Sequence, residues 1–475
     1  MAVTLCEQLL SGMHEQGSLL AAAAATEVAM RVLVCLVAAI LFVPASSRAA
    51  ETFCESAGTD CRAQILSYIR GELIRLDIAT EEITDPLIVD AIIARFRAKV
   101  PVRMLIEPRR NADEPLNGPA LAKLKAAGVP MRYKSVGDIL HWKMMIFAGQ
   151  HTVEFGAAQL TQKYLVPVQP FVNFTQDPIV FSNTTAIVQS FERKFDDTWT
   201  DVVNFANYGN AATVAPAYGA FAIDPSLNFV PAENFATRAK PLYDAETTAI
   251  DAIIYKVTDP VHPDAMIRAV KRGVPVRIIT EPNRYRNPDN TWQAYYLDRM
   301  WVAGVQIRNR KHLGFLHQKT ALLYSQRRTL FGSSNWTTAS SRTQYEHNYF
   351  ATDATFFNWF RQIFARKWAS TTETTAFVPL PPDVPVYVAP ANTAGGQSTT
   401  VVLSWKPGLW ARAADVYLGT ASSPALYLKD VSVTPGATKK LTVGGLQPGR
   451  SYFWKIVSKT AAGKTASGAV WSFGT

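Results

Sequence analysis

Short apolar runs alternate with stretches of helical periodicity over most of the first 370 residues. In the first half, Ile88–Arg97 and Ala120–Ala127 carry apolar residues at helical spacing, and Gly128 is a typical residue to end the second helix. Four apolar runs predict strands: Leu76–Ala79, Val102–Ile106, Met144–Phe147 and Thr152–Phe155. Alternating strands and helices predict an α/β fold, with a mainly parallel or mixed sheet flanked by helices.

The same order of elements occurs twice, because the chain contains an internal duplication. Val100–Pro108 recurs as Val274–Pro282 at an offset of 174 residues. Four further pairs match at 174 to 176 residues: Thr84-Asp85-Pro86 with Thr258-Asp259-Pro260, Ala127-Gly128-Val129 with Ala303-Gly304-Val305, His141-x-Lys143 with His317-x-Lys319, and Phe155–Thr161 with Phe331–Thr337. We therefore predict two pseudo-symmetric lobes, at residues 50–205 and 243–370.

Two segments lack this pattern and are predicted to connect domains. Residues 206–242, between the copies, are rich in Ala, Asn, Pro and Tyr without clear periodicity, so we expect a connection lying over the surface. Residues 371–377 contain several threonines and precede a group of prolines, which is typical of a linker.

The last hundred residues, 378–475, predict a separate small β-domain. Five segments have strand character: Thr399–Trp405, Ala414–Leu418, Lys439–Val443, Tyr452–Ser458 and Ala469–Phe473. Leu446-x-Pro448-Gly449-x-x-Tyr452 has the pattern of a tyrosine corner, and Trp405 lies early in the segment. The segment resembles a fibronectin type III domain, which implies a β-sandwich. Trp410 and Trp471 could contact a cell-surface glycan, or they could pack inside the protein.

The N-terminus has the order of a secretory signal. Met30-Arg31 precedes the apolar run 32–43 and the small residues 45–50, so we interpret residues 1–49 as a signal peptide region whose true start is Met30. A retained anchor is the alternative. Export to an oxidising compartment predicts a structural disulfide between Cys54 and Cys61, seven residues apart. The protein is therefore expected to be secreted, extracellular or periplasmic.

Composition excludes some classes and leaves the partner open. Hydrophobic residues make up 48% and charged residues 18%, which excludes a mostly disordered chain, and four cysteines exclude a disulfide-rich scaffold. The net charge of +10 permits an anionic partner such as nucleic acid, anionic lipid or acidic polysaccharide. Secreted proteins are often basic without a functional reason, so charge does not choose among them.

The paired His-x-Lys motifs carry the candidate chemistry. On a strand, residues i and i+2 point to one face, so each copy offers an imidazole beside an ammonium group. A carboxamide, Gln159 or Asn335, follows each lysine by sixteen residues, behind a glycine and small residues. Lysines and amides suit the nonbridging oxygens of a phosphodiester. One histidine can attack phosphorus while the other protonates the leaving oxygen and then activates water. This chemistry requires no metal or other cofactor.

With these motifs the chain resembles the phospholipase D superfamily over roughly residues 60–370. The family motif is His-x-Lys-x4-Asp followed by Gly-Ser-x-Asn, on two lobes whose His-Lys pairs meet in one cleft. The resemblance implies that His141, Lys143, His317, Lys319, Gln159 and Asn335 are catalytic. It further implies that Gly156, Gly332, Ser333 and Ser334 bind substrate.

The chain also departs from the family motif. Ala148 and Tyr324 stand where the motif has aspartate, and Ala157-Ala158-Gln159 replaces Ser-x-Asn in the first copy. Glu346, eleven residues after Asn335, lies where family members often carry an acid that orients the catalytic imidazole, and we expect it to orient His317. The first copy has no clear equivalent; Gln176 and Asp177 are the nearest polar candidates. Similar enzymes most often use the N-terminal histidine, here His141, as nucleophile, and the sequence leaves that choice open.

Three functions remain open. The first is a secreted, metal-independent phosphodiesterase that releases a phospholipid head group, with Leu140, Trp142, Phe315 and Leu316 as an acyl-facing rim or as core residues. The second is a nuclease of the same superfamily, whose positive charge binds a phosphate backbone. The third is a catalytically dead protein that binds a cell surface or glycan through its C-terminal domain. Two lobes in one chain would make a monomer sufficient for catalysis.

Overall fold

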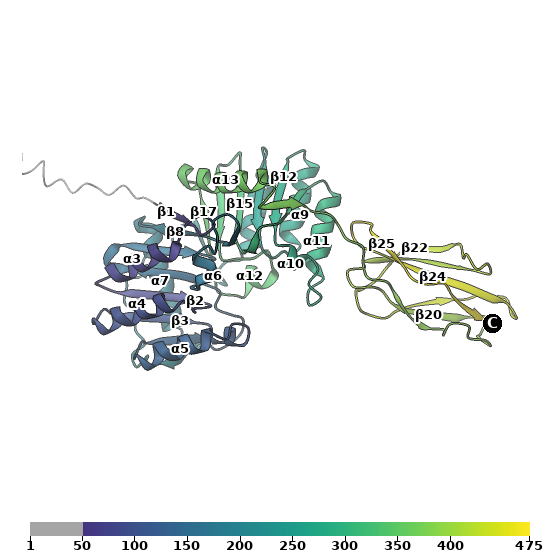
Figure 1. The fold of residues 1–475 in the computed structure, drawn as a ribbon, viewed down its shortest axis with the longest axis horizontal. Helices are drawn as coiled ribbons and strands as arrows, with labels where there is room; N and C mark the ends of the chain where they lie inside the picture. The colour runs from purple at the N-terminus through teal and green to yellow at the C-terminus, as the bar shows by residue number, and fades with distance from the viewer. Residues whose placement is uncertain (1–50) are drawn as a thin grey trace, which may run out of the picture. The chain divides into compact units, whose positions relative to one another are not determined.

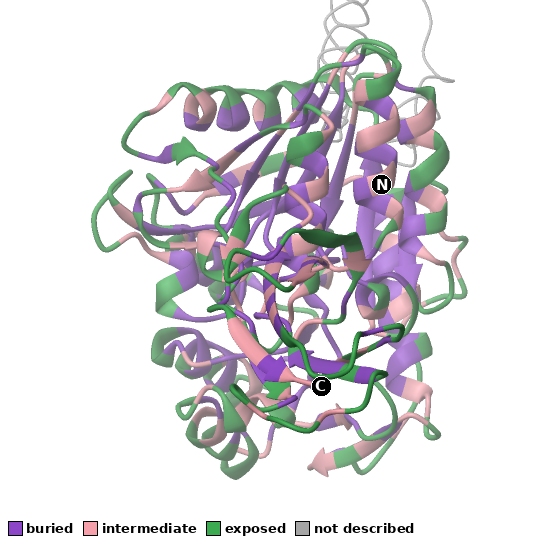
Figure 2. Cartoon of the chain, turned by 90° about the vertical axis from the view of Figure 1, so that its right-hand side faces the viewer, coloured by how far each residue is buried: buried purple, intermediate pink, exposed green. Residues whose placement is uncertain are grey.

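A computed structural model describes residues 51–475 (Figure 1). The predicted signal peptide region, with its start at Met30, lies outside these residues. Within them, no helix combines the length and apolar character needed to cross a bilayer. Buried residues concentrate on the central strands, and the outward faces of the helices are exposed (Figure 2).

The first lobe is built on a mixed sheet of eight strands. Their order is β1(Glu51–Glu55), β8(Pro178–Ser182), β6(Thr152–Gly156), β5(Lys143–Phe147), β2(Leu76–Thr80), β3(Val102–Ile106), β4(Met131–Lys134) and β9(Phe205–Gly209). β2, β3 and β4 are parallel, whereas the other pairings are antiparallel. The principal helices are α3(Cys61–Gly71), α4(Pro86–Arg97), α5(Asn117–Ala126) and α7(Thr185–Thr200).

The second lobe repeats this topology strand for strand. Its order is β10(Leu227–Val230), β17(Glu346–Ala351), β16(Arg328–Gly332), β15(Lys319–Leu323), β11(Ile250–Ile254), β12(Val276–Thr280), β13(Gln306–Arg310) and β18(Thr374–Ala376). The principal helices are α8(Phe235–Ala245), α9(Val261–Lys271), α11(Trp292–Val302) and α13(Ala354–Ala369). The predicted pair of pseudo-symmetric α/β lobes is confirmed.

Local chemistry explains where the elements begin. At α4, the Asp85 side chain accepts hydrogen bonds from the N–H groups of Leu87 and Ile88, and Pro86 occupies the first turn, where a missing N–H costs nothing. The central strands β2 and β3 are buried at every residue, because α3, α4 and α5 cover one face and α7 of the same lobe packs on the other. The Cys54–Cys61 disulfide joins β1 to the first residue of α3.

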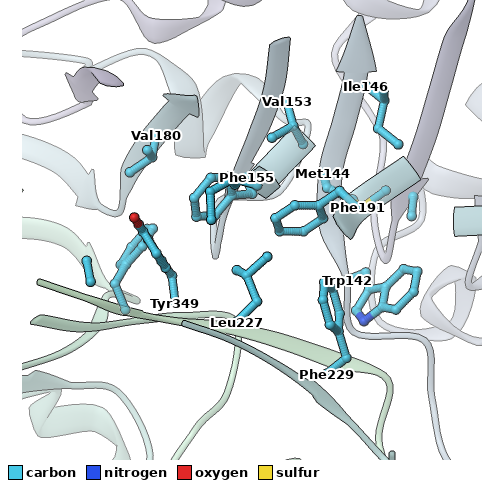
Figure 3. Packing of buried hydrophobic residues seen from close by; sticks show 14 of the residues in the cluster. Trp142, Met144, Ile146, Val153, Phe155, Val180, Phe191, Leu227, Phe229 and Tyr349 are labelled. Carbon is cyan, nitrogen blue, oxygen red and sulfur yellow. The ribbon is translucent and has the colours of Figure 1, made fainter. Parts of the chain in front are cut away.

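An apolar core between the two sheets joins the lobes. Figure 3 shows Trp142, Phe155 and Phe191 of the first lobe facing side chains of the second. Phe155 contacts Tyr349 with ring centroids 6.0 Å apart, and Trp142 contacts Phe229 at the same separation. This core belongs to both lobes. It therefore fixes the position of each lobe's motif relative to that of the other.

The two predicted connections are more ordered than expected. Residues 206–242 include most of β9, all of β10 and the start of α8, and Leu227 and Phe229 are buried in the core between the lobes. The predicted linker 371–377 contains β18, which extends the second sheet by pairing with β13. The structure differs from the expectation at β10 and β18, because sheet pairing and inter-lobe burial, which local periodicity does not reveal, order these parts of the two segments.

The C-terminal residues form two further sheets around one apolar cluster. They contain β19(Val386–Ala389), β20(Val401–Lys406) and β23(Lys439–Val443) in one sheet, and β21(Ala413–Gly419), β22(Leu426–Ser432), β24(Ser451–Lys459), β25(Thr465–Ser467) and β26(Trp471–Gly474) in the other. The Tyr452 hydroxyl accepts a hydrogen bond from the N–H of Gln447. Trp410 packs against Arg286 of the second lobe and Trp471 against Tyr387, so both indoles serve packing. The fibronectin type III assignment stays a prediction.

Candidate active site

Short parallel pairings between the lobes place both histidines. The strand β14(Leu313–Leu316) of the second lobe pairs with β7(Asn173–Gln176) of the first, so that Leu316 lies opposite Gln176. A single bridge, Leu140 with Tyr345, forms the pseudo-symmetric counterpart. In both cases the next residue along one segment is the motif histidine. The next residue along the other segment is a carboxylate.

Each histidine is therefore held by a carboxylate from the opposite lobe. Glu346 Oε2 lies 2.7 Å from His141 Nδ1, and Asp177 Oδ2 lies 2.7 Å from His317 Nδ1. The expectation that Glu346 orients His317 was wrong, because the pairing between lobes carries Glu346 to the first motif. Asp177 completes the second pair. Sequence reasoning named it only as a nearby candidate, because it lies eighteen residues after Gln159, whereas Glu346 lies eleven after Asn335.

The two lysines are buried beside their histidines. Lys143 Nζ donates to the carbonyl oxygen of His141 at 2.8 Å, and Lys319 Nζ donates to that of His317 at 2.5 Å. The i,i+2 spacing thus brings ammonium and imidazole groups together in each lobe. Burial lowers the pKa of Lys319 to about 7, although the nearby carboxylate of Asp177 acts in the opposite direction.

Glu81 is a site residue that sequence reasoning missed. It directly follows β2, and its Oε2 accepts hydrogen bonds from Lys143 Nζ at 2.7 Å and Gln159 Nε2 at 2.5 Å. The same oxygen lies 3.4 Å from His141 Nε2. The internal duplication contains one indication of this residue. The position of the second copy that matches Glu81 is Tyr255, so the two copies differ there by a carboxylate in place of a tyrosine.

The predicted substrate-binding glycines and serines lie behind the cleft. A Cβ on Gly332 would come within 2.2 Å of the His347 carbonyl oxygen, and one on Gly156 within 3.0 Å of that of Pro178, so these glycines permit close strand contact. Ser333 Oγ donates to Glu346 Oε2 at 2.5 Å, and Ser334 is fully buried. The structure thus places these four residues in support of the site, without contact to its cavity.

A cavity of about 760 Å³ lies between the lobes. Both histidines and both amides line it, together with Glu81, Arg110, Lys163, Tyr255, Lys256 and Arg284. Asn335 is 8% exposed, and its Oδ1 has no hydrogen-bond partner within residues 51–475. Of the four expected rim residues, Phe315 lines the cavity, whereas Leu140, Trp142 and Leu316 are buried in the inter-lobe core.

The electrostatics of the two histidine pairs differ. Burial, together with the positive charges of Lys319 and Lys143, holds the pKa of His317 well below its usual value. Burial also raises the pKa of Asp177 to about 7. Beside His141, burial acts to raise the pKa of Glu346, but the charge and hydrogen bond of His141 outweigh it and the pKa falls below its usual value.

The site can bind an anion and transfer protons at one place. Two imidazoles have Nδ1 fixed by a carboxylate, which leaves Nε2 of each for the cleft, and lysine and amide donors lie beside them. Within residues 51–475, no group of three or more His, Cys, Asp or Glu side chains is arranged to hold a metal ion. Fold and site define a class of two-lobed α/β enzymes that act on phosphodiester bonds.

Comparison with known proteins identifies the family within this class. Residues 72–199 and 242–368 match the family described as "Cardiolipin synthase, PLD-like domain". Since these matches cover more than half of the chain, the chain belongs to the phospholipase D superfamily. Members of this superfamily act on phosphodiester bonds.

Individual relatives are distant. The human mitochondrial cardiolipin hydrolase is 25% identical over 162 residues, which cover 34% of this chain and 60% of the relative. That of Chlamydomonas reinhardtii is 27% identical over 122 residues, 26% of this chain and 52% of the relative. The chain thus spans little more than half the length of these relatives. Among solved structures, the phosphatidylserine synthase of Haemophilus influenzae Rd KW20 is similar in fold, with a TM-score of 0.54 and 14% identity over 69% of this chain and 87% of that one.

Proposed function

We propose that this protein is a secreted, metal-independent phosphodiesterase that hydrolyses the head-group phosphodiester of a phospholipid through a phosphohistidine intermediate. The observation that carries the proposal is the pair of cleft histidines, each held at Nδ1 by a carboxylate of the other lobe. A catalytically inactive relative would have no need to retain both histidine–carboxylate pairs. The lysines and amides bind the nonbridging oxygens, and the histidines perform nucleophilic and acid–base catalysis.

The charges around the cleft support a single phosphodiester over a nucleic acid. Arg110 lies 2.8 Å from Asp113 and 3.4 Å from Glu81, and Lys163 lies 2.7 Å from Glu114, so carboxylates already lie against these two cations of the cleft. Each carboxylate would also repel the successive phosphates of a polyanion. A phospholipid such as phosphatidylcholine presents a single phosphodiester and therefore avoids the repulsion of successive phosphates.

Apolar side chains beside the cleft offer a surface for acyl chains. Val168 lines the cavity and is 79% exposed, while Phe171 and Val172 on the same loop are each 44% exposed. Leu313 is 63% exposed, and its N–H donates to the carbonyl oxygen of Val172. Exposed apolar residues gathered at the mouth of a site suit a membrane-borne substrate. The names of the relatives, cardiolipin hydrolase and phosphatidylserine synthase, point to the same class of substrate.

Secretion is supported by the disulfide between Cys54 and Cys61, because disulfides persist in oxidising compartments. The N-terminal signal pattern predicts the same destination. Appearance of the protein in the culture medium or periplasm with the cysteines oxidised supports this part of the proposal. Retention as a reduced cytoplasmic protein contradicts it.

The test is turnover by the purified protein in EDTA, with phosphatidylcholine vesicles, cardiolipin vesicles and plasmid DNA offered in parallel. We expect release of lipid head group that is lost in His141→Ala and His317→Ala. His151→Asn is the matched control, because His151 is exposed outside the cleft and has a φ of 44°, which asparagine tolerates. Preferred cleavage of DNA overturns the lipid assignment in favour of a nuclease. No turnover of any substrate overturns the proposed function.

A further inference from the structure

The carboxylate of Glu81 breaks the symmetry of the two half-sites. Thr80 pairs with Lys143 in the first lobe and Ile254 pairs with Lys319 in the second, so the residues that follow, Glu81 and Tyr255, occupy equivalent positions. Glu81 Oε2 contacts Lys143 Nζ, Gln159 Nε2 and His141 Nε2 within 3.4 Å. The first half-site therefore has a carboxylate on the histidine nitrogen that remains for the cleft.

The second half-site has an aromatic ring at this place. The Tyr255 ring lies 4.9 Å from the imidazole of His317 between centroids, and its centroid is 5.2 Å from Lys319 Nζ. The tyrosine hydroxyl accepts a hydrogen bond from Arg284. His317 thus has one carboxylate, Asp177 on Nδ1, and cations around its other side.

Hydrogen-bond capacity distinguishes the two histidines. An ionised carboxylate only accepts hydrogen bonds, and a neutral imidazole has a single N–H group. Glu346 is hydrogen-bonded to Nδ1 of His141, and Glu81 Oε2 lies at ion-pair distance, 3.4 Å, from its Nε2, so each carboxylate favours a proton on the nitrogen that it faces. Burial acts to raise the pKa of Glu81, but Lys143 and His141 outweigh it and hold this pKa far below its usual value.

His317 is suited to the neutral state, in which only one ring nitrogen carries a proton. With one proton on Nδ1, directed at Asp177, it keeps a lone pair on Nε2 for the cleft. Lys319, Lys143 and Arg284 disfavour a second proton, and burial does so most strongly, which is the reason for the depressed pKa of this histidine.

We propose that Glu81 assigns different roles to the two histidines, so that His317 is the nucleophile and His141 the proton donor. The proposal rests on the phosphodiesterase function proposed above. Nε2 of His317 forms a bond to phosphorus while the bond from phosphorus to the leaving oxygen breaks, and that oxygen takes the electron pair and the Nε2 proton of His141. Neutral His141 then removes a proton from water, whose oxygen attacks phosphorus and releases His317 and a phosphomonoester.

Glu81 is a positioning residue in this scheme, since it acts through His141. In the free protein its Oε2 lies where the leaving oxygen must approach Nε2, and it also binds Lys143 and Gln159, the phosphate-binding donors of the first lobe. The charged or titratable groups facing His141 are Glu81, Glu346, Lys143, His317 and His347. Glu81 is the carboxylate among them that touches Nε2.

The first experiment identifies the nucleophile with bis(4-nitrophenyl) phosphate, whose nitrophenolate departs without a proton. Alkaline quenching and peptide mass spectrometry should locate the phosphoryl adduct on His317. His141→Ala should keep a burst of nitrophenolate and accumulate the adduct, because its base for the second step is missing, whereas His317→Ala should give no burst. An adduct on His141, or a burst in His317→Ala, overturns the assignment.

The second experiment tests Glu81 itself. In Glu81→Gln we expect kcat on phosphatidylcholine or cardiolipin vesicles to fall by about tenfold or more, with much less effect on the aryl diester. KM for the lipid should fall, because Lys143 and Gln159 are released from Glu81 to bind the phosphate. Glu82→Gln is the matched control, since Glu82 contacts Arg110 and Lys163 instead. An equal loss of kcat on the lipid and on the aryl diester in Glu81→Gln contradicts the role given to Glu81.

The experiments distinguish failure of the histidine assignment from failure of the proposed phosphodiesterase function. Turnover with the adduct on His141 overturns the assignment of roles and leaves the proposed function intact. Absence of turnover and of any adduct, on lipids and on the aryl diester, overturns both.

Discussion

Asp177 of the first lobe lies 2.7 Å from the imidazole of His317 in the second lobe, 140 residues further along the chain. Glu346 and His141 form the pseudo-symmetric counterpart of this pair, at the same distance and 205 residues apart in the chain. Each lobe therefore contains a histidine that the other lobe orients. Neither half-site is complete by itself, and the inter-lobe pairings are part of the chemistry as well as of the fold.

Removing either carboxylate should disable one histidine while leaving its lobe folded. For Asp177→Asn and Glu346→Gln we expect kcat to fall about 100-fold or more, because an amide does not hold the imidazole in the required protonation state. The measurement is kcat on bis(4-nitrophenyl) phosphate and on lipid vesicles. Glu233→Gln at the surface serves as the control and should retain full activity. Equal activity in all three variants would show that the carboxylates have no catalytic part.

Gly314 is the point where the inter-lobe pairing is most sensitive. Its φ is +88°, and a Cβ there would come within 2.2 Å of the Phe174 carbonyl oxygen, so Gly314→Ala should separate β14 from β7 and move Asp177 from His317. Gly273 has a φ of +84° with nothing near its Cβ. Gly273→Ala should cost about 1–2 kcal/mol of unfolding free energy and keep kcat.

Comparison of these two alanine variants separates backbone strain from lost pairing. Urea unfolding and kcat should be measured on both proteins. A Gly314→Ala enzyme as active as Gly273→Ala would contradict the importance of the β7–β14 pairing for the site.

Phosphate binding should weaken as pH rises, because the pKa of Lys319 is lowered to about 7. A lysine carries its charge below its pKa, so the cation is present at pH 6 and mostly lost at pH 9. Dimethyl phosphate is a monoanion throughout this range, and we expect its inhibition constant to rise about tenfold between these values. In Lys319→Gln the inhibition constant should be higher at pH 6 and should rise less steeply with pH, the remaining rise coming from ionisation of Asp177. A steep rise that persists in this variant would assign the dependence to another group.

Glu154 on β6 should make stability depend on pH. Burial raises its pKa from 4.5 to about 8. Between these values the folded chain holds a proton that the unfolded chain has released, so this contribution is complete below pH 4.5 and is lost as pH rises through 8. Glu154→Gln should therefore remove a slope of up to about 1.4 kcal/mol per pH unit, measured by urea unfolding at pH 5, 7 and 8.5. Glu233→Gln should keep the wild-type slope, and loss of the slope in that variant would speak against Glu154.

Local sequence pattern was sufficient for most single elements. Val102–Ile106 and Lys439–Val443 are strands over the predicted residues, and the duplicated His-x-Lys motifs locate the two half-sites. Strand and helix periodicities depend on neighbouring residues, so they can be recognised in a single sequence. The strands β10 and β18 were missed, because they form by pairing with strands distant in sequence and local periodicity does not reveal such pairing.

The sequence by itself determined the two lobes, their α/β character, and the His-x-Lys pairs and amides that come together at one site. The tertiary structure decided which carboxylate serves which histidine, moved the predicted serines and glycines behind the cleft, and placed Glu81 against His141. These relationships arise from strand register and from contacts between residues up to 205 positions apart. Spacing along the chain does not encode such contacts, because the apolar core between the lobes fixes the register at which they meet.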